Sequence, residues 1–512
     1  MGTQRCDAGI ASISTDGAGN VYVLGVYDHS GTIGNYPLLI LPGSYTHNDD
    51  AMYFLAKIGA AGNVLWARNI FATTAEEGLI ESYTGADYFE EFYPYGGVAV
   101  DTAGNCYVAG VFIDSVVTID GFTLHNPTTP PAYSVKMFVA KFNTSGTAMW
   151  ASSYGGKGFM TPVAPVVSQQ GDMYLAGRYS GDSTITLGPS TLIAPLGNPS
   201  IPGDFIGDFL MKIDNTGASQ WAVAPDSSAF LNSVAVDTSG YVYITGQYGR
   251  DSINFGGHEL VNYEQTSRHG DVFLVKYDGA GHSIWAVDGG GAISASASSV
   301  ATDECGHVFI AGNLTTDSSG AIYFNGGGLY APVPNSYPMF IASFDAAGNY
   351  LSGQSAPDGG WGGITPLSVA ADNHGNLLVG GQWSSANFSF GPDHFTPDSG
   401  ETFMFVAKLQ YDSTGCLPYA GERVPPLPAP NADIALYPNP ATTQLTISAP
   451  ENITSITITN LLGQVVYSSK LAVGCLQASV DVAALPSGVY LVRVTGPSAG
   501  SEQVVVRKFV KD

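Results

Sequence analysis

Charged residues are scarce in this 512-residue sequence, and positive charge is the scarcest. Lys, Arg, Asp and Glu make up 12% of the chain, and 18 Lys and Arg stand against 43 Asp and Glu. The resulting net charge of −25 repels phosphate backbones and anionic lipid. We therefore expect no nucleic-acid partner, whereas cations, basic partners and neutral glycans stay open as ligands.

The sequence also has few cysteines and no long apolar run. No two cysteines have Cys-x-x-Cys spacing, which argues against a zinc site; the five are Cys6, Cys106, Cys305, Cys416 and Cys475. No run of about 18 apolar residues occurs, so we expect no transmembrane segment. The first residues likewise lack the apolar core of a signal peptide.

Recognisable catalytic motifs are missing too. The sequence has no Gly-x-Ser-x-Gly, Walker A, dinucleotide-binding or His-Glu-x-x-His motif, and its nine histidines are dispersed. We therefore predict no catalytic residue, no cofactor and no metal, with calcium on loop carboxylates as the alternative. Because carboxylates that pair in space are invisible in sequence spacing, a glycoside-cleaving site stays open.

Glycine and aromatic residues are abundant, and they follow an internal repeat. A turn glycine recurs six times at intervals of roughly 70 residues: Gly19, Gly104, Gly171, Gly240, Gly306 and Gly375. An aspartate stands three residues earlier in five copies, with Ser168 in the third: Asp16, Asp101, Asp237, Asp303 and Asp372. An aromatic residue follows each glycine by three positions except in the last copy, which has Leu378.

A second landmark follows in each copy. It is a Phe-x-x-Lys segment, whose lysines are Lys57, Lys141, Lys212, Lys276 and Lys408, with Ser343 in the fifth copy. A second turn glycine comes next, and in four copies a tryptophan stands four residues after it: Trp66, Trp150, Trp221 and Trp285. Because an active site is a single constellation, the recurring Asp and Lys predict turn capping and pairing between strands.

The fourth copy shows how one repeat folds. Residues 233–237 alternate in polarity and predict a strand; Asp237 and Gly240 predict a tight turn. Three more β-rich segments follow, at 242–245, 272–276 and 283–286. One four-stranded antiparallel sheet cannot bury both faces alone, so the repeats must pack on one another.

Six such units over residues 10–420 predict an all-β fold, a six-bladed β-propeller, because an open solenoid would need polar caps at its ends. The landmarks resemble those of the SBBP β-propeller repeat family, which is recognised by its repeat and not by a shared activity. We interpret residues 1–9 as the remnant of a truncated start, which leaves seven blades in the complete protein as an alternative.

The composition changes after residue 420. Residues 421–432 form a proline-rich linker, and residues 433–512 alternate strand and turn signals that predict a small immunoglobulin-like β-sandwich. Four short motifs mark this segment. They are Tyr437-Pro438-Asn439-Pro440, 460–464 around Gly463, 485–490 with Gly488 and Tyr490, and 508–511 beginning at Lys508.

These motifs, in this order, resemble the type A sorting domain of the type IX secretion system. The resemblance implies that the secretion machinery is a partner and that the protein passes through the periplasm to the outer cell surface or the medium. The route also needs an N-terminal export signal, which residues 1–9 lack.

One insertion departs from the repeat, at about residues 75–95. It mixes acids and aromatic residues, which suit calcium and sugar rings, and its binding candidates are Glu81, Tyr83, Asp87, Tyr88, Glu90 and Phe92. The alternative is a loop that only packs on its own repeat. We expect a binding scaffold for a glycan or protein ligand. A secreted hydrolase or lyase acting on polysaccharide or peptide, and a structural surface-layer component, are the alternatives.

Overall fold

A computed structural model of the chain confirms the all-β prediction: its described residues form strands and turns and no helix. The structure describes residues 8–38, 52–71, 96–126, 134–195, 205–262, 270–331, 337–356, 364–412 and 435–511, less breaks at 28–29, 113–114, 157, 182–183, 250, 292–293, 316–319, 373, 384–387, 391–392, 396–402, 438–440, 449–452, 461–463, 471–476 and 499–500. Two compact units, Met1–Val424 and Pro425–Asp512, divide within the predicted linker. We call the first unit the array.

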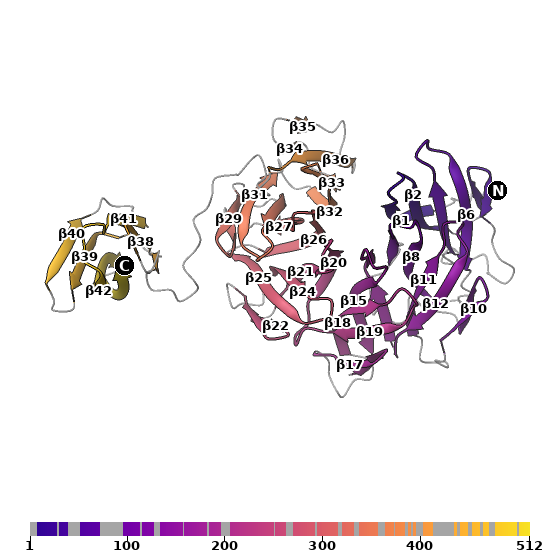
Figure 1. The fold of residues 1–512 in the computed structure, drawn as a ribbon, viewed down its shortest axis with the longest axis horizontal. Helices are drawn as coiled ribbons and strands as arrows, with labels where there is room; N and C mark the ends of the chain where they lie inside the picture. The colour runs from indigo at the N-terminus through magenta and orange to yellow at the C-terminus, as the bar shows by residue number, and fades with distance from the viewer. Residues whose placement is uncertain are drawn as a thin grey trace. The chain divides into compact units, whose positions relative to one another are not determined.

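The fourth repeat shows the basic sheet of the array. Its strands are β20 (Phe230–Val236), β21 (Val242–Tyr248), β24 (Asp271–Tyr277) and β25 (Ser283–Gly291), antiparallel and adjacent in that order (Figure 1). The turn after β20 closes because the Gly240 amide donates to the Asp237 carbonyl at 3.0 Å. Gly240 has a φ of 85°, which an L side chain rarely adopts.

The other repeats share this plan. The first has β1 (Ala8–Thr15), β2 (Val21–Tyr27), β5 (Met52–Ile58) and β6 (Val64–Phe71). The second has β7 (Gly97–Val100), β8 (Cys106–Phe112), β11 (Ser134–Phe142) and β12 (Ala148–Tyr154). The third has β14 (Val166–Val167), β15 (Met173–Gly181), β18 (Phe205–Ile213) and β19 (Ser219–Val223), plus β13 (Gly158–Pro162), which pairs with both β15 and β11. The fifth has β26 (Ser294–Thr302), β27 (Val308–Thr315), β30 (Met339–Phe344) and β31 (Tyr350–Ala356).

The sixth repeat is shorter in the described residues. It has β32 (Ile364–Ala371), β33 (Asn376–Trp383) and β36 (Phe403–Gln410), which form a three-stranded sheet.

Every repeat also carries a β-hairpin between its second and third sheet strands, which the sequence reasoning missed. The hairpin of the fifth repeat also pairs with β25 of the fourth. The hairpins are β3 (Gly31–Ile33) with β4 (Tyr36–Leu38), β9 (Val116–Ile119) with β10 (Phe122–His125), β16 (Thr184–Leu187) with β17 (Ser190–Ile193), β22 (Ser252–Phe255) with β23 (His258–Val261), β28 (Gly320–Phe324) with β29 (Gly327–Ala331), and β34 (Phe388–Phe390) with β35 (Asp393–Phe395). In the fourth repeat the turn is Gly256-Gly257, with φ of 62° and 107°, as two-residue hairpin turns require.

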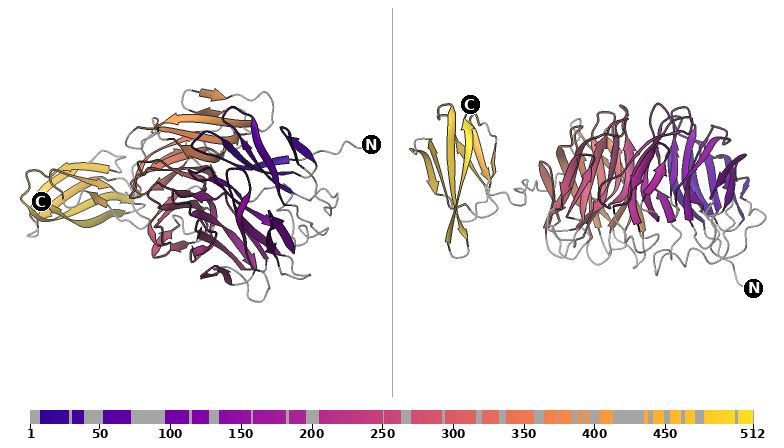
Figure 2. Two further views of the ribbon diagram at one scale, coloured as in Figure 1. Left: turned by 45° about the vertical axis from the view of Figure 1, so that its right-hand side comes forward. Right: turned by 90° about the horizontal axis from the view of Figure 1, so that it is seen from below.

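Each sheet packs face to face on the next sheet in chain order. Tyr174 and Leu210 of the third repeat share one core with Leu231 and Val234 of the fourth. Equivalent shared cores join the other neighbouring repeats. The sheets therefore follow one another along an arc from β1 to β36 (Figure 1), and their strands run side by side in Figure 2.

The C-terminal unit is a sandwich of two sheets. One consists of β37 (Ala435–Tyr437), β38 (Gln444–Ser448) and β41 (Gln477–Asp481). The other consists of β40 (Val465–Lys470), β39 (Ser455–Asn460), β42 (Gly488–Ser498) and β43 (Ser501–Lys511). Leu445, Ile447 and Val480 of the first sheet meet Ile456 and Val492 of the second in a buried core. None of the described residues forms a helix long and apolar enough to cross a membrane.

Candidate functional site

The recurring aspartates cap the first turn of their repeats. Asp237 Oδ1 accepts hydrogen bonds from the amides of Ser239 and Tyr241, both at 2.9 Å, and its Oδ2 accepts the Tyr243 hydroxyl at 3.0 Å. The same two amides, two and four residues on, bond to the carboxylates of Asp16, Asp101, Asp303 and Asp372. Each of these carboxylates therefore accepts hydrogen bonds within its own turn and acts as a structural cap of that turn.

Four of the five recurring lysines lie over the aromatic residue of the same repeat, and Lys408 is the exception. Lys57 Nζ lies 4.7 Å from the Tyr22 ring centroid and 3.3 Å from Asp16 Oδ2. Burial raises the pKa of Asp16, but hydrogen bonds from Asn20 and Lys57 outweigh it and hold that pKa at about 2. Lys57 and Asp16 therefore neutralise each other inside the repeat.

The cluster recurs with variations in the other repeats. Lys141 lies 4.7 Å from the Tyr107 ring and 3.9 Å from Asp101. The third repeat has Ser168 at the aspartate position, and there Lys212 pairs with Asp172 instead, at 2.8 Å. Lys276 lies 5.1 Å from the Tyr243 ring centroid, and Lys408 of the sixth repeat is exposed.

The tryptophans connect successive repeats. The indole Nε1 of Trp66, Trp150, Trp221 and Trp285 donates to a backbone carbonyl in the second turn of the following repeat, at 3.0 to 3.2 Å. The glycine of that same turn lies under the ring. A Cβ built on Gly281, for example, would stand 2.9 Å from a Trp221 ring carbon. The glycine is therefore needed for both its φ of 87° and the close approach of the indole.

A hydrogen bond to a serine side chain also connects neighbouring repeats, and the sequence patterns did not predict it. The hydroxyl of Ser299 accepts a hydrogen bond from the Val369 amide of the next repeat at 3.0 Å. Ser233 with Val300, and Ser12 with Val98, make the same contact at 3.2 and 3.3 Å. The signal was a serine four residues before the turn aspartate, which a search for catalytic spacing does not detect.

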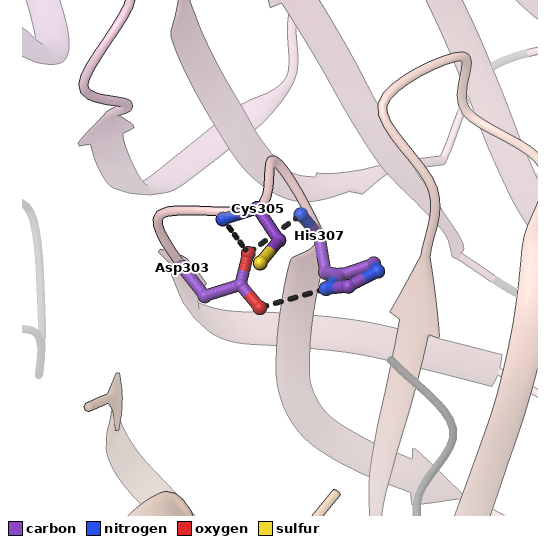
Figure 3. A group of neighbouring side chains, drawn as sticks. All are labelled: Asp303, Cys305 and His307. Atoms are coloured by element: carbon purple, nitrogen blue, oxygen red, sulfur yellow. Dashed lines mark hydrogen bonds and ion pairs between the residues drawn. The ribbon is translucent and has the colours of Figure 1, made fainter. Parts of the chain in front are cut away.

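One turn carries a set of side chains that could hold a metal ion. Asp303, Cys305 and His307 place one ligand atom each within 4.8 Å of one another (Figure 3). His307 Nδ1 lies 2.7 Å from Asp303 Oδ2, and Asp303 Oδ1 accepts the amides of Cys305 and His307. Carboxylate, thiolate and imidazole are all zinc ligands in proteins.

The repeat explains this arrangement without a metal. The residue four positions after the turn aspartate bonds to its Oδ2 in other turns as well: Asn20 to Asp16 at 2.8 Å and Asn376 to Asp372 at 2.7 Å. His307 therefore takes the place of an asparagine that completes the cap. The predicted absence of a cofactor or metal stays a prediction.

The motifs of the C-terminal unit meet in its sandwich. Tyr490, on β42, donates from its hydroxyl to the Pro486 carbonyl at 2.8 Å, and its ring stacks on Phe509 of β43 with centroids 5.4 Å apart. The Ala441 amide, just after the Tyr-Pro-Asn-Pro segment, donates to the Val510 carbonyl at 2.8 Å. The residue directly after the first motif is thus bonded to the last motif, on β43.

The remaining predicted residues of this unit are placed by its backbone. Gly488 begins β42 and pairs with Lys511, whereas Lys508 pairs with Leu491, and Tyr437 ends β37. Four predicted positions of this unit and the whole insertion lie outside the described residues, and their roles stay predictions. They are Pro438, Asn439, Pro440 and Gly463, and the insertion candidates Glu81, Tyr83, Asp87, Tyr88, Glu90 and Phe92.

Residues 435–512 match the protein family described as the secretion system C-terminal sorting domain, which confirms the predicted sorting domain. This match supports export through the type IX secretion system. The chain has a distant curated relative, the uncharacterized WD repeat-containing protein L264 of Acanthamoeba polyphaga mimivirus. The two are 23% identical over 393 residues, which cover 66% of this chain and 26% of the relative. The chain thus spans about a quarter of the relative's length.

Solved structures resemble the chain only weakly. TcdA4 of Morganella morganii is 9% identical, with 96% of this chain and 22% of that chain covered and a TM-score of 0.22. The extracellular domain of the putative one component system BT4673 from B. thetaiotaomicron is 8% identical, with 98% and 99% covered and a TM-score of 0.13. Scores this low do not establish a common fold.

Proposed function

We propose that the protein is exported by the type IX secretion system to the outer cell surface or the medium, where its array acts as a binding scaffold. The observation that carries the export is the C-terminal unit. Its sequence matches the sorting-domain family over residues 435–512, and Tyr490 of its third motif stacks on Phe509 of its last motif inside one small sandwich.

The array is a β-propeller of SBBP type in this proposal. Support comes from six sheets that pack face to face in chain order, and from a relative whose name records WD repeats, the units of one propeller class. Propellers close radially and so protect their outer strand edges, which suits a protein that works outside the cell.

A scaffold role is supported by how the array uses its ionisable groups. The Asp, Tyr and Lys of the repeats are held in turn caps and contacts between neighbouring strands, as at Asp16, Tyr22 and Lys57. Such groups stabilise a rigid frame, and ligand contacts fall to the loops that the frame presents. A neutral glycan or a basic protein surface is the ligand class that the net charge of −25 favours.

Deletion of residues 433–512 tests the export. The full chain and the deleted chain are each given an N-terminal export signal and expressed in a bacterium with a type IX system. We expect the full chain at the surface or in the medium and the deleted chain in the periplasm. Arrival of both at the surface refutes the sorting role. Screening the purified array against glycan and protein arrays tests the scaffold, and uniform silence counts against it.

A further inference from the structure

The sixth repeat exposes apolar side chains at positions that are buried in every other repeat. Val406 of β36 is 78% exposed. The residues at its position in the other five repeats are at most 1% exposed: Leu55, Val139, Leu210, Leu274 and Ile341. Met404 is 87% exposed, and Leu378, at the aromatic position, is 41% exposed. One face of the sixth sheet therefore has no neighbour in the described residues.

The first repeat has the opposite face uncovered. Ile13 of β1 is 63% exposed and Ile10 is 66% exposed. The valines at the position of Ile13, three residues before the turn aspartate, are 3% to 6% exposed in four other repeats: Val98, Val234, Val300 and Val369. Leu231, at the position of Ile10, is 6% exposed.

These two faces are the two halves of one kind of interface. Inside the array, Val300 packs in one core with Tyr243 and Leu274 of the preceding sheet. Val369 packs in the same way with Phe309 and Ile341. The face of β1 is thus the half that covers a preceding sheet. The face of β33 and β36 is the half that a following sheet covers.

The second-turn glycine of the first repeat also differs from its equivalents in its contacts. In the second to fifth repeats the second-turn glycine lies against the indole of the preceding repeat: Gly146, Gly217, Gly281 and Gly348. A Cβ built on Gly62, the equivalent glycine of the first repeat, meets nothing within 4 Å. Among the described residues, no atom of another repeat lies against Gly62 in the way that the indoles lie against the other four glycines.

The first and sixth sheets do not cover each other. Packed sheets lie about 10 Å apart and bury the side chains between them. Side chains that are 63% to 87% exposed on both faces exclude such packing. Figure 1 shows β1 and β2 at one end of the arc and β33 and β36 at the other.

We propose that one further four-stranded unit of the same repeat fills the space between β36 and β1, joined to the chain on the N-terminal side of β1. Such a unit carries both halves of the interface, as each interior repeat does. The proposal rests on the propeller fold proposed above, and is independent of export and of any ligand.

The connections between repeats favour this side of the chain. The fourth strand of one repeat leads directly to the first strand of the next, as β25 ends at Gly291 and β26 begins at Ser294. A unit ahead of β1 reaches β1 by the same short connection. After β36, by contrast, the chain continues into the C-terminal unit.

The test adds a copy of residues 230–294 directly before Ala8 of the full chain. This join keeps the repeat in register, because Ala8 and Ala295 both lie eight residues before a turn aspartate. Ile13→Cys and Val406→Cys report on the two faces by maleimide labelling, read on their own peptides by mass spectrometry. Val234→Cys and Leu274→Cys are the buried controls at the same repeat positions.

We expect Ile13→Cys and Val406→Cys to label readily in the original chain, and both to lose their labelling in the extended chain, as the controls do. Labelling of both in the extended chain overturns the proposal. If only Ile13→Cys loses its labelling, the added unit covers the first sheet but not the sixth, and the repeats form an open row. This result overturns the proposal and the propeller fold together.

A disulfide test keeps the proposal falsifiable if the extended chain does not fold. Ser299→Cys with Val369→Cys spans an observed interface, where the serine oxygen and the valine nitrogen lie 3.0 Å apart. Ser368→Cys with Ile13→Cys is the equivalent pair across the two ends of the array. We expect the first pair to form a disulfide in the original chain and the second pair to stay reduced. A disulfide between residues 13 and 368 overturns the proposal, because the ends would then meet directly.

Discussion

Gly281→Ala will destabilise the array more than Gly62→Ala, although the two glycines hold the same turn position. Their φ values are 87° and 82°, so both substitutions place a side chain in the left-handed region at a cost of about 1–2 kcal/mol. The new Cβ at 281 also meets the Trp221 ring at 2.9 Å, whereas the one at 62 meets nothing within 4 Å. Overpacking of this kind costs about 1–3 kcal/mol more.

Denaturant unfolding followed by tryptophan fluorescence measures the difference. All six tryptophans lie in the array, so the C-terminal unit is silent in this assay: Trp66, Trp150, Trp221, Trp285, Trp361 and Trp383. Adding Trp221→Ala to Gly281→Ala removes the overlap, and we expect a coupling energy of about 0.5–3 kcal/mol in the double-mutant cycle. Equal losses for Gly281→Ala and Gly62→Ala, with no coupling, would refute the packing of each tryptophan on the next repeat.

Three further predictions concern other parts of the chain. Asp237→Ala removes the acceptor of two amides and a tyrosine hydroxyl and should lower the free energy of unfolding by about 1–3 kcal/mol. Asp372 is more exposed than Asp237, so Asp372→Ala should cost less. The midpoints of denaturant unfolding of the two variants measure this difference. Burial raises the pKa of Asp288 from 3.8 to about 7. The contribution of its protonated carboxyl to the stability of the fold is therefore complete below about pH 4 and is lost as the pH rises through 7. Asp288→Asn should therefore reduce the stability loss between about pH 5 and pH 8 by ~2 kcal/mol, and an unchanged pH profile speaks against the raised pKa of that carboxyl. Tyr490→Ala removes the stack on Phe509 and should lower the amount of exported protein, whereas wild-type export with an unfolded sandwich contradicts a role for this core.

The repeat made the sheets of the array predictable from sequence. Asp237, Gly240 and Tyr243 fix a turn and the two strands beside it, and their recurrence places the same turn in each copy. The hairpins were missed because their strands are short and lie between the landmarks. A signal was present, since an apolar residue stands just before a turn glycine at Leu187 and at Phe255.

Contacts between repeats were beyond sequence reasoning. The bond from Trp221 to Gly279, or from Val369 to Ser299, joins residues 58 and 70 positions apart, and no local pattern pairs them. The same holds in the sorting domain. Its motifs predicted its family, but only the structure shows that the amide of Ala441, the residue after the first motif, bonds to Val510 of the last motif.

Transfer of residues 433–512 to the C-terminus of an unrelated periplasmic protein measures directly whether this unit is an export signal. In a bacterium with a type IX system, we expect the fusion to reach the cell surface or the medium, and in a strain without that system to stay in the periplasm. A fusion that remains periplasmic in both strains, while its sandwich is folded, would contradict the sorting function of the C-terminal unit.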